Sequence, residues 1–91
     1  MAKISAHVYI EGRVQGVFFR QNTKRKAISI GVKGWIRNLD DGRVEAVFEG
    51  EEAAVKSLVD FSGKGPIGAS VTKITVDWEP FQDKFGSFEV V

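Results

Sequence analysis

The sequence has no cysteine and a single histidine, His7, among its 91 residues. Without cysteine the chain has no disulfides, no thiol nucleophile and no thiolate metal site, and one histidine is too few for a histidine-rich metal site. No apolar run approaches the roughly 18–20 residues that cross a bilayer, and residues 1–6 lack the apolar core of a signal peptide. We therefore expect a cytoplasmic protein with no bound metal and no membrane segment.

The remaining composition is that of an ordinary globular domain, with 43% hydrophobic and 27% charged residues and a formal net charge of +1. A chain of this length holds one hydrophobic core, so we expect a single domain over residues 1–91. The charges are segregated: residues 12–39 contain seven basic side chains and no acidic one, whereas residues 40–60 contain seven carboxylates. This segregation fits an anionic partner for the first third, and it fits equally well two helix faces of opposite sign.

Hydrophobic periodicity indicates both strands and helices. Alternation of apolar and polar residues predicts four strands, at residues 4–11, 33–39, 43–50 and 74–79. Apolar residues at helical spacing predict two helices, at residues 19–30 and 51–62, the first of which ends at Gly31. Asp40-Asp41-Gly42 is a hairpin signal between the second and third strands, and residues 87–91 are long enough for one short extra strand.

This β-α-β-β-α-β order predicts an α+β, ferredoxin-like sandwich. Two right-handed crossovers give an antiparallel sheet in the order 4-1-3-2, with both helices on one face and a short extra strand at the C-terminus. The other face of the sheet stays open, and the side chains that we expect there include His7, Tyr9, Trp35 and Glu45.

Residues 12–20 form the loop that leads from the first strand into the first helix. A strand followed by a helix suits an anion site, because an anion in the loop then lies at the start of the helix. Gly16 allows backbone conformations that a side chain forbids, so successive N–H groups can converge on an anion near the positive end of the helix. Arg20 lies in the first helical turn, from which its planar guanidinium can return to the same anion. When the loop is considered alone, it is explained equally well as a tight turn followed by a solvated arginine.

Asn38 belongs to a second group of residues, 34–45. Because the second strand runs parallel to the first, its carboxyl end reaches the same edge of the sheet as the loop, which places Asn38 near the anion. The amide can accept a hydrogen bond from a water and donate one to an oxyanion. Taken alone, an asparagine that forms a turn before a hairpin is the simpler interpretation.

Together the two segments resemble the two signatures of the acylphosphatase family. The first signature is matched by GRVQGVFFR at residues 12–20, with Thr23 and Ala27 following, and the second by GWIRN at residues 34–38 and DGRVE at residues 41–45. The resemblance covers essentially the whole chain. It departs from several family members at residues 88–91, where they have a basic residue followed by an aromatic one.

The resemblance implies hydrolysis of a small acyl phosphate to a carboxylate and inorganic phosphate, with no metal, no cofactor and no covalent intermediate. Carried over by position, Arg20 binds the phosphoryl group, Asn38 orients the attacking water, and Thr23 supports the site through a hydrogen bond. The loop would bind the same phosphoryl group through its backbone, at Gln15, Gly16, Val17, Phe18 and Phe19. We further expect a monomer with no nucleic-acid partner.

Two other functions are compatible with this fold. A non-catalytic regulatory domain would keep the anion-binding loop without turnover, although an asparagine beside the loop favours the enzyme. RNA-recognition domains share the order of elements and stack bases on aromatic residues of the first and third strands. Here the third strand would present Glu45, Val47 and Glu49 on the open face, and carboxylates there would repel phosphate.

We interpret the other aromatic residues as packing residues rather than as ligand contacts. We expect Phe18 to pack in the loop, and Phe19 and Trp78 to pack in the core. Trp35 on the open face is interpreted as covered by neighbouring side chains, with weak self-association as the alternative.

Overall fold

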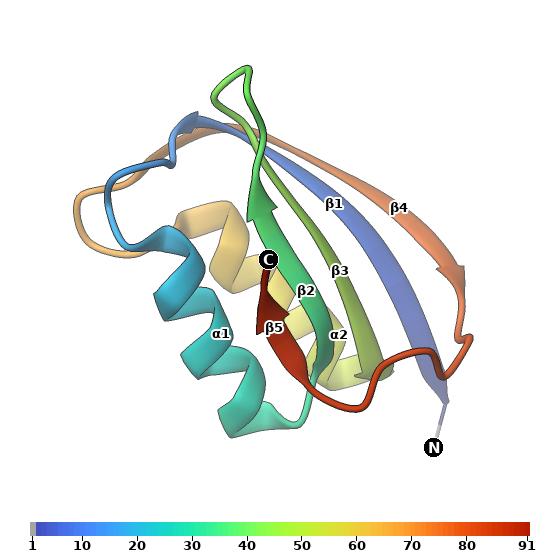
Figure 1. The fold of residues 1–91 in the computed structure, drawn as a ribbon. Helices are drawn as coiled ribbons and strands as arrows, with labels where there is room; N and C mark the ends of the chain where they lie inside the picture. The colour runs from blue at the N-terminus through green and yellow to red at the C-terminus, as the bar shows by residue number, and fades with distance from the viewer. Residues whose placement is uncertain (1) are drawn as a thin grey trace.

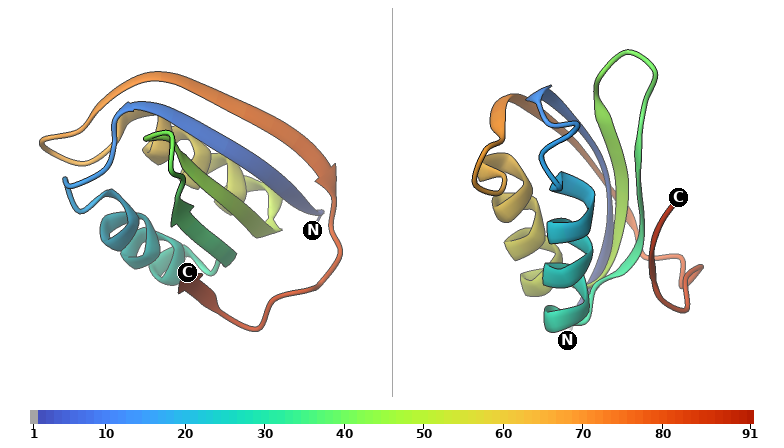
Figure 2. Two further views of the ribbon diagram at one scale, coloured as in Figure 1. Left: turned by 45° about the horizontal axis from the view of Figure 1, so that its top comes forward. Right: turned by 60° about the vertical axis from the view of Figure 1, so that its left-hand side comes forward.

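Five strands and two helices form two layers in the computed structural model, which describes residues 2–91 (Figure 1). The strands are β1 (Lys3–Arg13), β2 (Lys33–Asn38), β3 (Val44–Glu51), β4 (Ser70–Pro80) and β5 (Phe88–Val90). The helices are α1 (Phe19–Ile30) and α2 (Glu52–Lys64), and both lie on the same side of the sheet (Figure 2). The ferredoxin-like α+β arrangement expected from the sequence is therefore confirmed. None of the helices within residues 2–91 is long and apolar enough to cross a membrane.

The strand order is β4-β1-β3-β2-β5, which confirms the predicted order of the first four strands. These four pair in antiparallel fashion, whereas β5 adds to the outer edge of β2 in parallel, so the whole sheet is mixed. The parallel direction follows from the path of residues 81–87, which lead from the end of β4 around the sheet to the side of β2 (Figure 2).

Of the predicted strands, β4 differs most in its bounds from the prediction, because it begins at Ser70 rather than at residue 74. Of its extra residues, Lys73 pairs with Glu11, whereas Val71 and Ser70 pair with the end of β1 beyond a register shift between Glu11 and Gly12. Gly12 has φ +125°, and a Cβ atom there would collide with the Ser70 carbonyl. A bulge of this kind breaks the alternation of apolar residues, so periodicity alone underestimates the strand.

The core lies between the sheet and the two helices. The fully buried side chains of the helices follow the predicted stripes: Phe19, Thr23 and Ala27 from α1, and Val55, Leu58 and Ser62 from α2. Gly31 ends α1, as the sequence predicted. It adopts the left-handed conformation, with φ 78°, and its N–H group donates to carbonyls of the last turn.

The prediction that Trp78 packs in the core is wrong. Its side chain is 50% exposed, although its partner across the strand pair, Ala6, is completely buried. The reason is that β4 is an edge strand, flanked by β1 on one side only. The predicted order 4-1-3-2 already placed this strand at the edge, but the alternation of apolar residues within it resembles that of a central strand.

Candidate functional site

The loop between β1 and α1 and the β2–β3 hairpin lie at the same end of the sheet, as the parallel course of β1 and β2 predicted (Figure 1). The loop is anchored in the core at both ends, because Val14 and Phe19 are each only 1% exposed. Between these anchors, Gly16 has φ 74° and Phe18 has φ 58°. Left-handed residues are the elements from which anion-binding backbone concavities are built.

The first turn of α1 presents a positive end without a neutralising side chain. No side chain among residues 2–91 caps the helix at Phe18, and its first turn holds no acidic residue. The N–H groups at the start of a helix have no partner within the helix, and they carry a partial positive charge. This end of the helix is therefore suited to an anion.

An open cavity of about 390 Å³ lies at this loop. It is lined by Val14, Gln15, Gly16, Phe18, Phe19, Arg20 and Gln21. Arg20 is half-buried, and none of the carboxylates within residues 2–91 forms an ion pair with it. The side chains of this lining include one cation and no acid.

The Gln15 side chain ties the loop to the hairpin. Its Nε2 donates to the carbonyl of Leu39 at 2.8 Å and to the carbonyl of Arg43 at 3.0 Å. The Arg43 carbonyl also accepts a hydrogen bond from the Leu39 N–H, at 2.8 Å. Sequence reasoning considered only the backbone of Gln15 and missed this contact, since nothing local in the sequence shows that the hairpin carbonyls face the loop.

Asn38 is the last residue of β2, directly before Leu39, and it pairs with Val44 of β3. The Oδ1 atom of Asn38 is buried and accepts no hydrogen bond from a group of residues 2–91. Buried polar atoms in folded proteins are almost always hydrogen-bonded, so an unpartnered one calls for an explanation. An amide oxygen is an acceptor with two lone pairs, so Oδ1 has unused hydrogen-bonding capacity.

Thr23 lies fully buried one turn into α1. Its Oγ1 donates to the carbonyl of Phe19 at 2.8 Å, four residues earlier in the same helix. This hydrogen bond lies in the helical turn that also carries Arg20, and a supporting role for Thr23 at the site stays a prediction.

Of the two adjacent phenylalanines, only Phe19 packs as predicted. Phe18 is 77% exposed, and it lines the cavity at the loop. The expectation that Phe18 packs in the loop is therefore wrong. The left-handed backbone at this residue directs the side chain away from the core, which the run of apolar letters in the sequence cannot reveal.

The open face of the sheet carries the four residues predicted there, and they contact one another. Glu45 is buried, and its carboxylate accepts hydrogen bonds from His7 Nε2 at 2.6 Å and from Arg37 Nε at 2.7 Å. Burial raises the pKa of Glu45, but the hydrogen bonds from His7, Arg37 and Tyr9 outweigh burial and hold that pKa below its ordinary value. The interaction with Glu45 in turn raises the pKa of Tyr9.

Aromatic rings on this face are covered by cations. The guanidinium of Arg37 lies 5.3 Å from the centroid of the Trp35 ring, and that of Arg43 lies 5.0 Å from the centroid of Tyr9. Trp35 is thus covered by a neighbouring side chain, as interpreted from the sequence. The cluster is internally paired and has no unpartnered acceptor of the kind found at Asn38.

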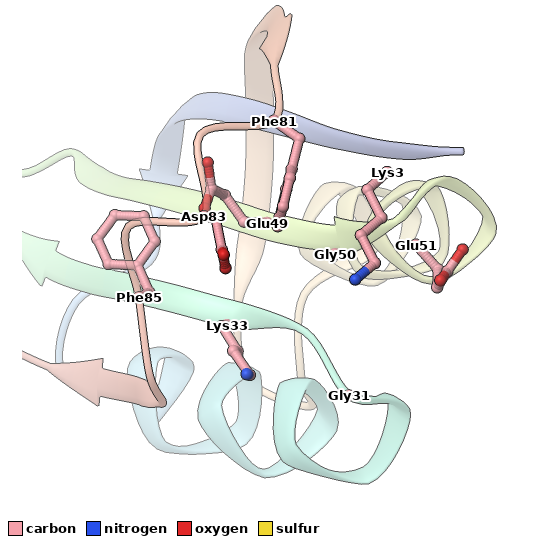
Figure 3. Close-up of a pocket in the computed structure, with 9 residues that line it drawn as sticks. All are labelled: Lys3, Gly31, Lys33, Glu49, Gly50, Glu51, Phe81, Asp83 and Phe85. Atoms are coloured by element: carbon pink, nitrogen blue, oxygen red, sulfur yellow. The ribbon is translucent and has the colours of Figure 1, made fainter. Parts of the chain in front are cut away.

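A second cavity, of about 230 Å³, lies at the opposite end of the sheet, where β2 begins and β3 ends (Figure 3). It shares no residue with the β1–α1 loop or with the turn of the hairpin, residues 39–43. Lys3, Lys33, Glu49 and Asp83 bring charges of both signs to it. The Glu49 carboxylate accepts hydrogen bonds from the N–H groups of Gln82 and Lys84, at 3.0 and 3.3 Å. The contacts in this cavity thus fasten the segment that leads to β5.

Comparison with known proteins agrees with this geometry. A family model described as acylphosphatase matches residues 6–90. The chain is similar to an acylphosphatase from Pyrobaculum islandicum, with 48% identity over 92 residues that cover 100% of this chain and 97% of that protein.

Solved structures are similar over almost the same length. An acylphosphatase from Bacillus subtilis is 35% identical, with a TM-score of 0.92 over 97% of this chain and 98% of that chain. An acylphosphatase from Coxiella burnetii is 33% identical, with a TM-score of 0.92 over 99% of this chain and 94% of that chain. The family model, the close relatives and the fold all agree, so the chain belongs to the acylphosphatase family.

Proposed function

We propose that the protein hydrolyses acyl phosphates to a carboxylate and inorganic phosphate at the cavity formed by the β1–α1 loop. The observation that supports this most directly is the Gln15 side chain, which holds the loop that carries Arg20 against the residue that follows Asn38. A group suited to bind a phosphoryl anion and a group suited to hold a water thus lie on two segments that are hydrogen-bonded to each other.

The phosphoryl group would be bound by Arg20 and by backbone N–H groups of residues 15–19. Arg20 lines the cavity and pairs with none of the described carboxylates, so its planar guanidinium is available to two phosphoryl oxygens at once. The left-handed residues Gly16 and Phe18 and the uncapped start of α1 favour the same charge. Fixed donors of this kind stabilise the charge on the equatorial oxygens without rearranging during the reaction.

Asn38 would orient the attacking water through its side-chain amide, whose Oδ1 has no partner among residues 2–91. An amide has no basic nitrogen or carboxylate to remove a proton, so its contribution is to position the water in line with the bond that breaks. The proton of that water can pass to an oxygen of the substrate phosphate.

Beyond phosphoryl binding and a positioned water, the reaction needs few other catalytic groups. The leaving group is a carboxylate with a pKa of about 4–5, which departs without a general acid. The loose transition state of phosphoryl transfer needs little help from a general base, because the water is barely deprotonated when the bond breaks. The cavity lining contains no Ser, Thr, His, Lys, Asp or Glu side chain to serve as a nucleophile, which supports direct attack by water.

We further propose that the protein works as a monomer in the cytoplasm, on a small molecule rather than a nucleic acid. An RNA-recognition surface needs exposed aromatic rings on β1 and β3. On β1 the Tyr9 ring is stacked on His7 and lies under Arg43, and the only aromatic residue of β3, Phe48, is buried in the core.

The test is hydrolysis of benzoyl phosphate in the presence of a chelator, followed by ultraviolet absorbance, for the wild type and three variants. We expect Arg20→Ala to lose both turnover and phosphate affinity, and Asn38→Ala to lose turnover while it still binds inorganic phosphate. Arg25→Ala is the matched control, since Arg25 is exposed on the same helix outside the cavity. A folded wild type that binds phosphate but does not hydrolyse the substrate would contradict the proposal in favour of a non-catalytic anion-binding domain.

A further inference from the structure

Phe18 occupies a position where neither packing nor backbone preference explains an aromatic side chain. Its ring is 77% exposed, whereas that of the adjacent Phe19 is 1% exposed. Its φ of 58° lies in the left-handed region, which bulky residues seldom adopt and which glycine or asparagine adopts easily. The loop uses glycine at its other left-handed position, Gly16, so a large ring at Phe18 is not required by the backbone.

The backbone that carries this ring is fixed. The Phe18 carbonyl accepts two hydrogen bonds from Asn22, one from its backbone N–H at 3.0 Å and one from its side-chain Nδ2 at 2.9 Å. The following residue is held by the hydrogen bond from Thr23 to the Phe19 carbonyl. The ring of Phe18 is therefore presented from a rigid turn, at the edge of the cavity that also contains Arg20.

The cavity offers apolar surface beside the cation. Val14, Phe18 and Phe19 line it together with Arg20. Of these three apolar side chains, only Phe18 is exposed, since Val14 and Phe19 are each 1% exposed. A substrate whose phosphoryl group is bound at Arg20 would therefore have the Phe18 ring as the apolar surface available to the rest of the molecule.

We propose, on the basis of the proposed function, that Phe18 forms an apolar subsite for the acyl group of the substrate. The side chain would favour flat, apolar acyl groups such as benzoyl over small ones such as acetyl. An exposed ring gains by the removal of apolar surface from water, and contact between two aromatic rings adds about a further 0.5–1.5 kcal/mol, which corresponds to roughly two- to tenfold in affinity. Phe18 is thus a specificity-determining residue, and it leaves the phosphoryl chemistry to Arg20 and Asn38.

The test compares two substrates that share the phosphoryl group. For the wild type and Phe18→Asn, kcat/KM is measured with benzoyl phosphate and with acetyl phosphate. Asparagine tolerates the left-handed backbone, so the loop keeps its conformation while the ring is lost. We expect the benzoyl-to-acetyl ratio to fall about fivefold in Phe18→Asn and to be retained in Phe18→Tyr. A change in the loop itself alters both substrates alike and cancels in this ratio.

Ile28→Ala is the control, because Ile28 is an exposed apolar residue of α1, 61% exposed, and it lies roughly 13 Å along the helix from its first residue, Phe19, at 1.5 Å per residue. A ratio in Phe18→Asn within twofold of the wild-type ratio would overturn the proposal, and so would an equal fall in Ile28→Ala.

A second measurement separates this inference from the proposed function. The affinities of phenylphosphonate and methylphosphonate, which are not hydrolysed, are measured by calorimetry for the same variants. If the wild type hydrolyses neither acyl phosphate, the proposed function fails, and the phenyl-to-methyl affinity ratio alone decides the role of Phe18. We expect that ratio to fall about fivefold in Phe18→Asn, and an unchanged ratio would overturn the apolar subsite.

Discussion

Arg37 and Asn38 are adjacent on β2, yet they belong to two polar regions of opposite character. Successive residues of a strand point to opposite faces, so Arg37 joins the cluster on the open face while Asn38 points to the other face. Asn38 directly precedes Leu39, whose carbonyl accepts a hydrogen bond from Gln15 of the loop. In the open-face cluster the buried Glu45 carboxylate has partners for both oxygens, from His7 and Arg37. At the loop, the buried Oδ1 of Asn38 has no partner among residues 2–91, and Arg20 pairs with no described carboxylate.

The contrast shows how the two regions use polar groups. A satisfied cluster holds its strands together and has little capacity left for a ligand. A buried acceptor without a partner, as at Asn38, costs stability, and such a cost is typical of sites that bind something else. Charge density alone does not separate the two regions, since the open-face cluster holds more charged groups than the loop does.

The largest effect should come from Arg20→Lys, which keeps the positive charge and removes the planar fork. A lysine offers a point charge on a flexible stem and cannot bind two phosphoryl oxygens in the same geometry. We expect kcat/KM with benzoyl phosphate to fall on the order of 10²–10³-fold, the effect of losing one well-placed donor to a developing anion. Retention of near-normal turnover in this variant would refute the role assigned to Arg20.

The next largest effect should come from Gln15→Met, which tests whether turnover depends on the contact between the β1–α1 loop and the hairpin. Gln15→Met keeps the length of the side chain and removes both hydrogen bonds to the hairpin carbonyls. We expect kcat to fall roughly tenfold, about 1.4 kcal/mol, while the inhibition constant of inorganic phosphate changes little.

A double-mutant cycle distinguishes positioning of Asn38 from a general loss of structure. If Gln15 acts through Asn38, the Gln15→Met substitution should have almost no further effect on turnover in an Asn38→Ala background. Additive losses in the double variant would show that Gln15 supports the fold and not the placement of Asn38.

The smallest effect on activity, with a clear effect on stability, should come from Glu45→Gln in the open-face cluster. We expect the free energy of unfolding at pH 7 to fall by about 1–2 kcal/mol, because hydrogen bonds to a charged partner are lost, while turnover stays within twofold of wild type. Urea denaturation followed by circular dichroism measures the first quantity, and the benzoyl phosphate assay measures the second.

The stability difference should also depend on pH in one direction. The pKa of Glu45 is lower in the folded chain than in the unfolded chain, so its ionised form stabilises the fold above the ordinary carboxyl pKa of about 4.3. This contribution is lost as pH falls through the lowered folded value. The wild type and Glu45→Gln should therefore differ in stability at pH 7 and converge in strong acid, and a difference that stayed constant with pH would contradict the assignment.

Much of the architecture followed from local patterns. Alternation along β1 and helical spacing along α1 and α2 located these elements, and the hairpin signal at Asp41-Gly42 located the turn before β3. These patterns work because a half-buried strand and a half-buried helix each impose a fixed period on the apolar residues. The same order of elements, with right-handed crossovers, then predicted the order of the first four strands of the chain.

For the site, the sequence by itself determined the residue types and their spacing: a glycine-containing loop, Arg20 one residue into a helix and an asparagine at the end of a parallel strand. Only the tertiary structure decided which groups remain unsatisfied and which surfaces remain open. The Gln15 contact joins segments that are 24 and 28 residues apart, and the exposure of Phe18 and Trp78 depends on a backbone angle and on an edge of the sheet. Periodicity reports which side of an element is apolar, whereas hydrogen-bond partners and exposure depend on what the rest of the chain places beside it.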